Sequence, residues 1–403
     1  MPIALFLFTI FFIFTKPFNL KFGTISFIGA VLALLLGYAK FSDLAMITNL
    51  ISGAMITFFA LITLSFIFEK NNSFEYLAIK IFSFNKTSFS FFISMLIFTA
   101  VLSIVFANDG AILVITPLLI VVIKMSRLDI KTATALLLSA SFMVDAASSF
   151  LITSNLTNII TASYFNISYT KFAKEMFLPS LISVVLSIFF LWLYFKKSLK
   201  FEFRLEKEAS LKDKRFFIIS NLVVFIALVF SFLGVDVVIC FSMAAVILLI
   251  LGKNLYSFKE FILGLPYQIV LFSFSIYVLV FSMQDTADLI AKFIGEIYEI
   301  SNTLAIVSTA FISAILSSLL NNLPSVTLMN LSLQSLNIKS LIYANLLGSN
   351  LGTKLSPLGS LATLLWLHIL EKNSLKISIR EFMKCGFAIT FIVLFYSSIA
   401  IAL

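Results

Sequence analysis

The sequence predicts an all-α polytopic membrane protein with two inverted-topology repeats, each of five transmembrane helices plus a re-entrant hairpin, and with broken helices at the midplane. Of 403 residues 61% are hydrophobic and 12% are charged, so nearly every window is apolar enough to span a bilayer. Each half also contains a long apolar segment interrupted by a polar cluster, followed by a second interrupted segment. Together these observations predict a membrane protein with an internal repeat.

Apolar runs of sufficient length locate the elements in order. In the first half we expect spans at 2–15, 22–39, 46–68 and 173–195, a hairpin at 89–123 and an interrupted span at 131–163. In the second half we expect spans at 216–233, 236–252, 264–283 and 384–403, a hairpin at 303–336 and an interrupted span at 340–370. The first span lacks a basic start and a small-residue cleavage site, which favours a retained helix over a signal peptide.

The long polar stretch 196–215 predicts a cytoplasmic central loop between a first repeat at 1–195 and a second at 216–403. Because each half crosses the membrane an odd number of times, the two halves should have opposite orientations. This topology places 22 Lys and Arg on the cytoplasmic side, five on the outer side and one, Lys354, within the membrane. The asymmetry agrees with the positive-inside rule and puts both termini outside.

The interruptions are the sequence's strongest indication of a site. Ala107-Asn108-Asp109-Gly110 breaks the first hairpin and Asn321-Asn322-Leu323-Pro324 the second, while the segment 145–158 corresponds in order to 350–363. Irregular backbone at membrane depth persists only where it is buried in protein or lines a cavity. Paired interruptions in corresponding places are typical of a transporter binding site between repeats, although two polar breaks could also recur by chance.

The stretch 348–360 is the most polar and most Gly/Pro-broken of these interruptions. Ser356 before Pro357 has the pattern of an N-cap followed by proline at the first helical position. We therefore expect a half-helix to begin here, with its free N–H groups facing the break.

Three ionisable residues, Asp109, Asp145 and Lys354, fall within or beside the breaks. A charge in the membrane centre costs at least ~2.5–3.5 kcal/mol, so such residues usually face a cavity and are functional. Asp145 corresponds to Asn350, so only one of the two halves can take up a proton at that place. We interpret Asp145, Lys354 and Asp109 as coupling residues. The alternative is a buried Asp145–Lys354 pair that only holds the repeats together.

Amide and hydroxyl side chains surround these charges and supply the predicted substrate-binding set. Its members are Asn108, Asp109, Ser154, Asn155, Asn158, Asn321, Asn322, Asn350, Thr353, Ser356 and Ser360. Such a lining suits a small hydroxylated or anionic solute better than a bulky apolar one. Any single Ser or Thr is more often bonded back to its own helix, so the asparagines are the stronger candidates.

Enzymatic functions find little support in the sequence. It contains no His-Glu-x-x-His, no Gly-rich phosphate loop and no Gly-x-Ser-x-Gly, and Cys240 and Cys385 share no metal-ligand spacing. We expect no cofactor, no metal and no nucleic-acid partner, and we attribute the net charge of +9 to membrane topology. Transport must then be driven by an ion gradient or by a partner protein.

The motifs resemble the arsenical-pump membrane proteins, an arsenite and antimonite efflux family within the ion transporter superfamily. The resemblance is carried by Phe106-Ala-Asn-Asp-Gly-Ala111, Ser154-Asn-Leu-Thr-Asn-Ile159, Asn321-Asn-Leu-Pro-Ser325, Tyr343-Ala-Asn345 and Ser356-Pro-Leu-Gly-Ser-Leu-Ala-Thr-Leu-Leu-Trp-Leu-His368. It implies proton-coupled export of trivalent arsenic or antimony hydroxide, an uncharged triol, across the bacterial inner membrane. A soluble ATPase subunit and a homodimer are the protein partners that it leaves open.

One departure from the family affects the predicted site. Many members read Gly-Cys-Asp-Leu-Gly-Pro-Lys where this chain has Gly348-Ser-Asn-Leu-Gly-Thr-Lys354, so Asn350 replaces a carboxylate and Thr353 a proline. Asp145 must then contribute more to coupling, or the ion or substrate differs. A sodium/proton antiporter, or a carrier for a small oxyanion or carboxylate, is therefore the alternative function, and a channel is a more distant one.

The topology is directly testable by cysteine labelling. In intact cells a membrane-impermeant thiol reagent should modify Lys40→Cys and Lys292→Cys, because both positions are predicted outside, and should leave Lys207→Cys unmodified. Permeabilised cells, in which Lys207→Cys should react, provide the control. The reverse pattern would contradict the predicted orientation of the two halves.

Overall fold

In the computed structural model, which describes residues 2–85, 87–126, 128–199 and 210–403, all regular structure in the described chain is helical. The side chains of Leu361 and His368 are not among those described. Within these described residues, eight helical stretches are long and apolar enough to cross a membrane. The predicted all-α membrane fold class is confirmed. The predictions for Lys207 and the rest of 200–209 lie outside the described residues.

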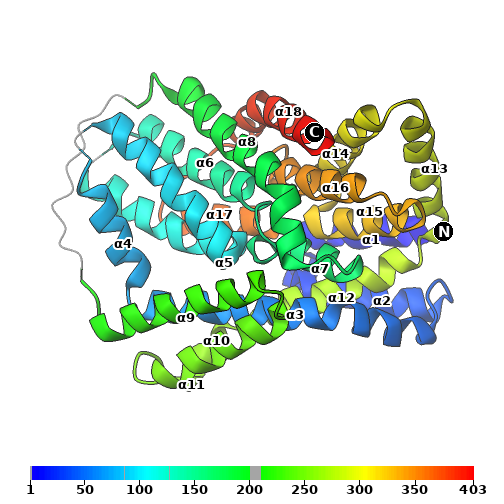
Figure 1. Cartoon of the computed structure of the whole chain (residues 1–403), viewed down its shortest axis with the longest axis horizontal. Coiled ribbons are helices and arrows are strands. Elements are labelled where there is room, and N and C mark those ends of the chain that lie inside the picture. The colour runs from blue at the N-terminus through cyan, green and yellow to red at the C-terminus, as the bar shows by residue number, and fades with distance from the viewer. Residues whose placement is uncertain (1, 86, 127, 200–209) are drawn as a thin grey trace.

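The helices follow the predicted order (Figure 1). The first half contains α1 (Pro2–Thr15), η1 (Pro17–Asn19), α2 (Phe22–Leu35), α3 (Phe41–Lys70), α4 (Ser73–Phe82), α5 (Ser88–Met125), α6 (Ile130–Ala147), η2 (Ile152–Ser154), α7 (Leu156–Tyr164) and α8 (Tyr169–Phe195). The second half contains α9 (Lys214–Phe232), α10 (Val237–Leu251), α11 (Phe258–Gly264), α12 (Tyr267–Phe281), α13 (Gln284–Ile300), α14 (Asn302–Leu320), α15 (Asn322–Leu336), α16 (Lys339–Gly352), η3 (Pro357–Gly359), α17 (Leu361–Lys372) and α18 (Ile379–Ala402).

Three helices, α4, α11 and α13, were not predicted. A search for long apolar runs misses them because α4 and α11 are short and α13 is amphipathic, with charged residues along one face. In Figure 1, α4 and α13 lie at opposite ends of the long axis of the view. They occupy equivalent places in the chain, each between a long helix and the hairpin that follows.

Both predicted hairpins turn back at their polar clusters, and they do so with the same backbone conformation. Ala107 has φ 61° and ψ 156°, and Asn321 has φ 83° and ψ 151°, a region that residues other than glycine rarely adopt. Ser88, at the start of α5, donates to the Leu199 carbonyl, and Thr132, in the first turn of α6, donates to the Ser198 carbonyl at 2.8 Å. The starts of α5 and α6 therefore lie near the same stretch after α8.

The halves pack reciprocally. Helix α2 of the first half lies against α12 of the second, α10 of the second lies against α3 of the first, and α8 pairs with α18. Within the second half, Gly348 and Gly352 of α16 face Ala310 and Ala314 of α14, where an added Cβ would overlap the alanine backbone. Small residues four apart allow this close approach of two membrane helices.

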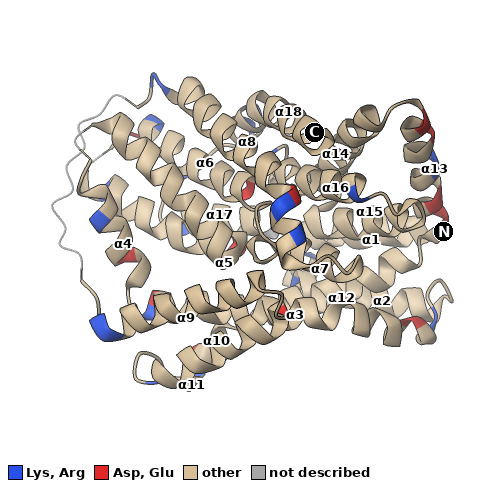
Figure 2. Ribbon diagram, in the orientation of Figure 1, with Lys and Arg blue, Asp and Glu red and all other residues tan. Residues whose placement is uncertain are grey.

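Several contacts join segments that the topology places on one side of the membrane. Lys70 forms a salt bridge with Glu260 at 2.7 Å, Asn71 accepts from the Asp213 backbone N–H at 2.8 Å, and Lys124 donates to Asn373 at 3.4 Å. Figure 2 shows Lys and Arg gathered at the end of the molecule that holds α4 and the start of α9. This arrangement is consistent with the predicted sidedness, which remains a prediction until labelling tests it.

Candidate functional site

The two interrupted segments have the same local structure. Each leaves its helix through a turn, forms one 3-10 turn (η2 or η3), passes through one extended residue and starts a second helix. The extended residues are Asn155, with φ −155° and ψ 145°, and Ser360, with φ −148° and ψ 142°. Each caps the helix that follows, because Asn155 accepts from the Thr157 N–H at 3.2 Å and Ser360 from the Ala362 N–H at 3.1 Å.

The predicted start of the second half-helix, at Ser356, was wrong, because the helix begins after Ser360. Ser356 does accept a backbone hydrogen bond, from Leu358 at 3.1 Å, but it caps only the short η3 turn. Helix α17 begins at Leu361, after Ser360. Both serines have the sequence signal of an N-cap, and the extra turn between them cannot be distinguished from a first helical turn by sequence.

A buried ion pair joins the two interrupted segments. Lys354 Nζ lies 2.7 Å from Asp145 Oδ2, and the two side chains are only 4% and 3% exposed. Asp145 also accepts hydrogen bonds from Thr353 at 2.7 Å and from Asn108 at 3.2 Å, while Lys354 donates to Ser141 at 2.9 Å. These extra partners offset the cost of removing both charges from water.

A second, uncharged contact joins the same two interrupted segments through Asn350. Asn350 Nδ2 donates to Ser149 Oγ at 3.0 Å and to Asn158 Oδ1 at 3.1 Å, and Asn350 Oδ1 accepts from Asn155 at 3.0 Å and from Thr157 at 2.9 Å. The two contacts are equivalent by position: Asp145 corresponds to Asn350, and each bonds a residue four places after the other, Lys354 and Ser149 respectively. We call these two contacts between the segments crossings. One crossing is charged, and the equivalent one is made of amides and hydroxyls.

A small cavity lies beside the crossing, between the two hairpin tips and the starts of α7 and α17. It is lined by Asp109, Asn155, Leu156, Thr157, Ile269, Phe272, Asn321, Asn322, Leu323 and Ser360. Its volume of about 20 Å³ holds little more than one water molecule. Among the described residues the Asp109 carboxylate has no hydrogen-bond or ion-pair partner, although the Asp109 backbone N–H donates to Asn108 at 2.9 Å.

The structure thus divides the predicted site residues into two groups. Asp109, Asn155, Asn321, Asn322 and Ser360 line the cavity. The others satisfy helix breaks or the two crossings and do not line it. They are Asn108, which bonds Asp145; Ser154, which donates to the Ile104 carbonyl; Asn158, which donates to the Ser148 and Leu151 carbonyls; and Asn350, Thr353 and Ser356.

Sequence reasoning missed the apolar wall and a chain of buried amides. Ile269 and Phe272 of α12 close one side of the cavity, and nothing in their apolar helix distinguishes them from other core residues. Asn345 donates to Asn330 at 3.1 Å, and Asn330 donates to Thr161 at 2.9 Å, which links α16, α15 and α7. The asparagine side chains at 330 and 345 were the available sequence signal for this chain of amides.

Paired helix breaks that meet at a buried polar cavity define the protein as a multi-pass membrane transporter of broken-helix architecture. Over residues 1–403 the sequence matches the arsenical pump membrane protein family, and the chain belongs to this family. Arsenical pump membrane proteins of Escherichia coli are 30% identical and, in strain K12, 31% identical, each over 99% of this chain and 97% of the relative. The putative one of Bacillus subtilis strain 168 is 27% identical over 93% of both chains.

A solved structure shares the fold. The chain resembles the Alcanivorax borkumensis YdaH transporter with a TM-score of 0.57 and 11% identity, over 88% of this chain and 86% of that one. As a member of the arsenical pump family the protein is a membrane transporter and not an enzyme, and it lies in the bacterial inner membrane as a multi-pass protein.

The amide crossing predicts that a carboxylate at position 350 is unfavourable in this chain. Asn158 directs both N–H bonds to backbone carbonyls, so its oxygen faces position 350 and needs a donor there. Asn350→Asp removes that donor and adds a buried charge, and should destabilise the purified protein by about 1–3 kcal/mol or more. Thermal unfolding in detergent measures the loss of stability. Asn373→Asp, at the solvent-facing end of α17, is the control. Equal stability of the two variants would contradict the assigned Asn350–Asn158 hydrogen bond.

The charged crossing predicts strong coupling between two substitutions. Asp145→Asn alone leaves Lys354 buried without its counter-ion and should cost about 3–5 kcal/mol. Removing both charges in Asp145→Asn/Lys354→Met should recover most of this stability, because no lone charge remains. The unfolding free energies of the wild type, both single variants and the double variant form a double-mutant cycle that measures the coupling. Additive losses would show that the two residues do not interact.

Proposed function

We propose that the protein is a secondary active carrier that exports arsenite and antimonite in exchange for protons by alternating access. The proposal rests chiefly on the chemistry of the central cavity, whose polar lining is amide, hydroxyl and a single unpaired carboxylate. Family membership supports an arsenical as the solute. A soluble ATPase subunit and a homodimer remain predictions.

The cavity suits a neutral polyhydroxy solute. Amides and hydroxyls both donate and accept, so they can bond each hydroxyl of an uncharged triol. The Asp109 carboxylate disfavours an anion at the same place, because the only lysine of the crossing, Lys354, is already paired with Asp145. At about 20 Å³ the cavity is too small for such a solute, so binding requires the hairpin tips and the interrupted segments to separate.

Asp109 is the carboxylate best placed to exchange a proton. It lines the cavity without a partner among the described residues, whereas Asp145 has a lysine, a threonine and an asparagine as partners. A proton taken up by Asp109 from the outer side neutralises the one charge among the described lining residues, and it is released to the cytoplasm when the solute binds there. Asp145 stays a coupling candidate, second to Asp109. Lys354 is the ion-pair partner of Asp145.

A sodium/proton antiporter is the alternative. A carboxylate beside amide oxygens is also a suitable environment for a hard cation, which takes oxygen ligands. A carrier for a small oxyanion or carboxylate is less well supported, because the unpaired charge in the cavity has the wrong sign for an anion.

Substituting Asp109 should separate coupling from binding. Asp109→Asn removes the titration but keeps the shape, so uptake of arsenite by everted vesicles under an imposed proton gradient should fall to the level without a gradient. Arsenite exchange at equilibrium should continue, since it requires no net proton movement. Asn322→Asp in the same vesicles controls for a mere change in the cavity's polarity, and a sodium gradient tests the alternative.

Gradient-driven uptake at the wild-type rate in Asp109→Asn would exclude Asp109 as the proton carrier and leave Asp145 as the next candidate. Driven transport of sodium but not of arsenite by the wild type would favour the antiporter.

A further inference from the structure

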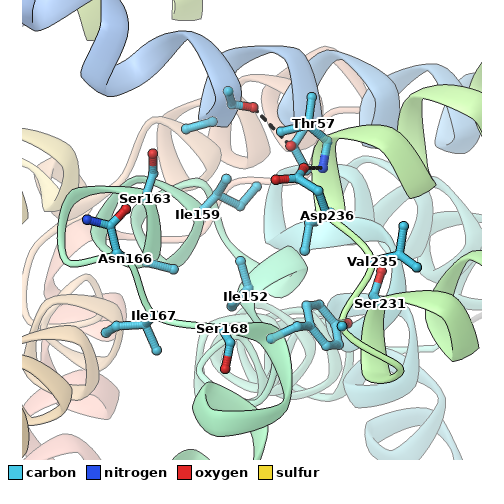
Figure 3. A pocket seen from close by; sticks show the side chains of 17 residues that line it. Thr57, Ile152, Ile159, Ser163, Asn166, Ile167, Ser168, Ser231, Val235 and Asp236 are labelled. Atoms are coloured by element: carbon cyan, nitrogen blue, oxygen red, sulfur yellow. Dashed lines mark hydrogen bonds between the residues drawn. The ribbon is translucent and has the colours of Figure 1, made fainter.

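A second, larger pocket lies outside the site described above (Figure 3). Its volume is about 400 Å³, and it is enclosed by the middle of α3, the turn between α7 and α8 and the turn between α9 and α10. Both turns are predicted on the outer side of the membrane. Figure 3 shows side chains from all three elements around one hollow, among them Thr57, Ser163, Ser168, Ser231 and Asp236.

One stretch of chain, from η2 to the start of α7, contributes to the linings of both the pocket and the central cavity. Ile152 of η2 and Ile159 of α7 face the outer pocket, whereas Asn155, Leu156 and Thr157, which lie between them in sequence, line the central cavity. Both isoleucines are 4% exposed. The interrupted segment of the first half is therefore the wall between the two spaces, and its movement would join them.

A side-chain contact holds this wall to the rim of the pocket. The hydroxyls of Thr153 and Tyr169 lie 3.1 Å apart, and the Tyr169 ring packs edge-on against Phe232 with ring centroids 5.0 Å apart. Thr153 belongs to η2, while Tyr169 begins α8 and Phe232 ends α9. Loss of this hydroxyl contact would remove one attachment of η2 to α8, at the rim of the pocket.

The polar groups of the pocket suit an uncharged solute. They are hydroxyls, an amide and one carboxylate, Asp236, one of whose oxygens accepts from the Val238 N–H at 2.7 Å at the start of α10. Among the described residues no Lys or Arg lines the pocket to attract an anion. Its volume of about 400 Å³ exceeds what a small triol needs, so it can hold that solute with part of its water.

We propose that this pocket is the outer vestibule of the carrier, through which the neutral polyhydroxy solute leaves, with Ile152 and Ile159 as its gate and Thr153–Tyr169 as the latch. The inference rests on the proposed function and on the predicted sidedness. It adds an exit route and residues that take part in neither the crossing nor the central cavity.

Labelling after folding tests the vestibule. In a Cys240→Ser/Cys385→Ser background, which we expect to export normally, Ser168→Cys places a thiol in the pocket on an exposed residue whose hydroxyl forms no cap bond. Lys40→Cys, exposed but outside the pocket, is the matched control. Intact cells are treated with a bulky, membrane-impermeant methanethiosulfonate or with the small methyl reagent, and arsenite export is then measured.

The bulky adduct at Ser168→Cys should stop most arsenite export, the methyl adduct should leave it nearly unchanged, and neither should matter at Lys40→Cys. Full export with a completely labelled Ser168→Cys, or labelling only from the cytoplasmic side, would overturn the vestibule while the proposed function stands. Failure of the unlabelled background and the wild type to export arsenite would instead remove the proposed function.

The latch has its own readout. Ile152→Cys should react slowly from outside, because the side chain at this position is buried, and adding Tyr169→Phe should speed its labelling by freeing η2. Tyr164→Phe, which removes a tyrosine hydroxyl that contacts Gln334 at the other end of α7, is the control. Equal labelling rates in the two tyrosine variants would show that Tyr169 does not hold the gate.

Discussion

Two helix breaks inside an apolar protein set the main constraint on this structure. Peptide groups and polar side chains at that depth have no bulk water to bond, so each must find a partner in the chain. The two interrupted segments meet this requirement by bonding to each other. Asp145 bonds Thr353 and Lys354 of the opposite segment, and Asn350 bonds Ser149, Asn155, Thr157 and Asn158 in return. Each half thereby completes the other.

This use of polar side chains limits what remains for the solute. Asn158 donates both side-chain N–H groups to the carbonyls of Ser148 and Leu151. The Asn350 side chain makes four hydrogen bonds, all of them within its crossing. At the hairpin tips, by contrast, Ala107 and Asn321 adopt a strained backbone, and Asp109 and Asn322 beside them line one cavity. Two of the strained positions therefore lie next to the residues that carry the proposed chemistry.

Hydropathy was sufficient to predict the long spans, both hairpins and both interruptions, because these signals are local in the sequence. Composition and the spacing of polar clusters also located the candidate site. What could not be predicted was which polar residues would satisfy the fold and which would face the solute. Asn155 and Asn158 are three residues apart in one motif, yet only Asn155 lines the cavity. Both side chains bond Asn350 of α16, almost two hundred residues away in the sequence, and the three-dimensional arrangement around Asn350 leaves only Asn155 beside the cavity. The amphipathic α13 was missed for a simpler reason, since its apolar face lacks the continuous run that marks a span.

The two crossings of the similar halves differ in what it costs to open them. Opening the amide crossing at Asn350 exchanges neutral hydrogen bonds for bonds to water, at a net cost of about 1 kcal/mol each. Opening the crossing at Asp145 and Lys354 separates two buried charges, which is much more costly unless water or a proton reaches the carboxylate. A second carboxylate at 350 would compete for the same lysine, so the asparagine there keeps the two costs different. The two crossings are therefore unequal in energy although they are built from equivalent segments, and in the proposed mechanism the proton goes to the unpaired Asp109 rather than to the paired Asp145.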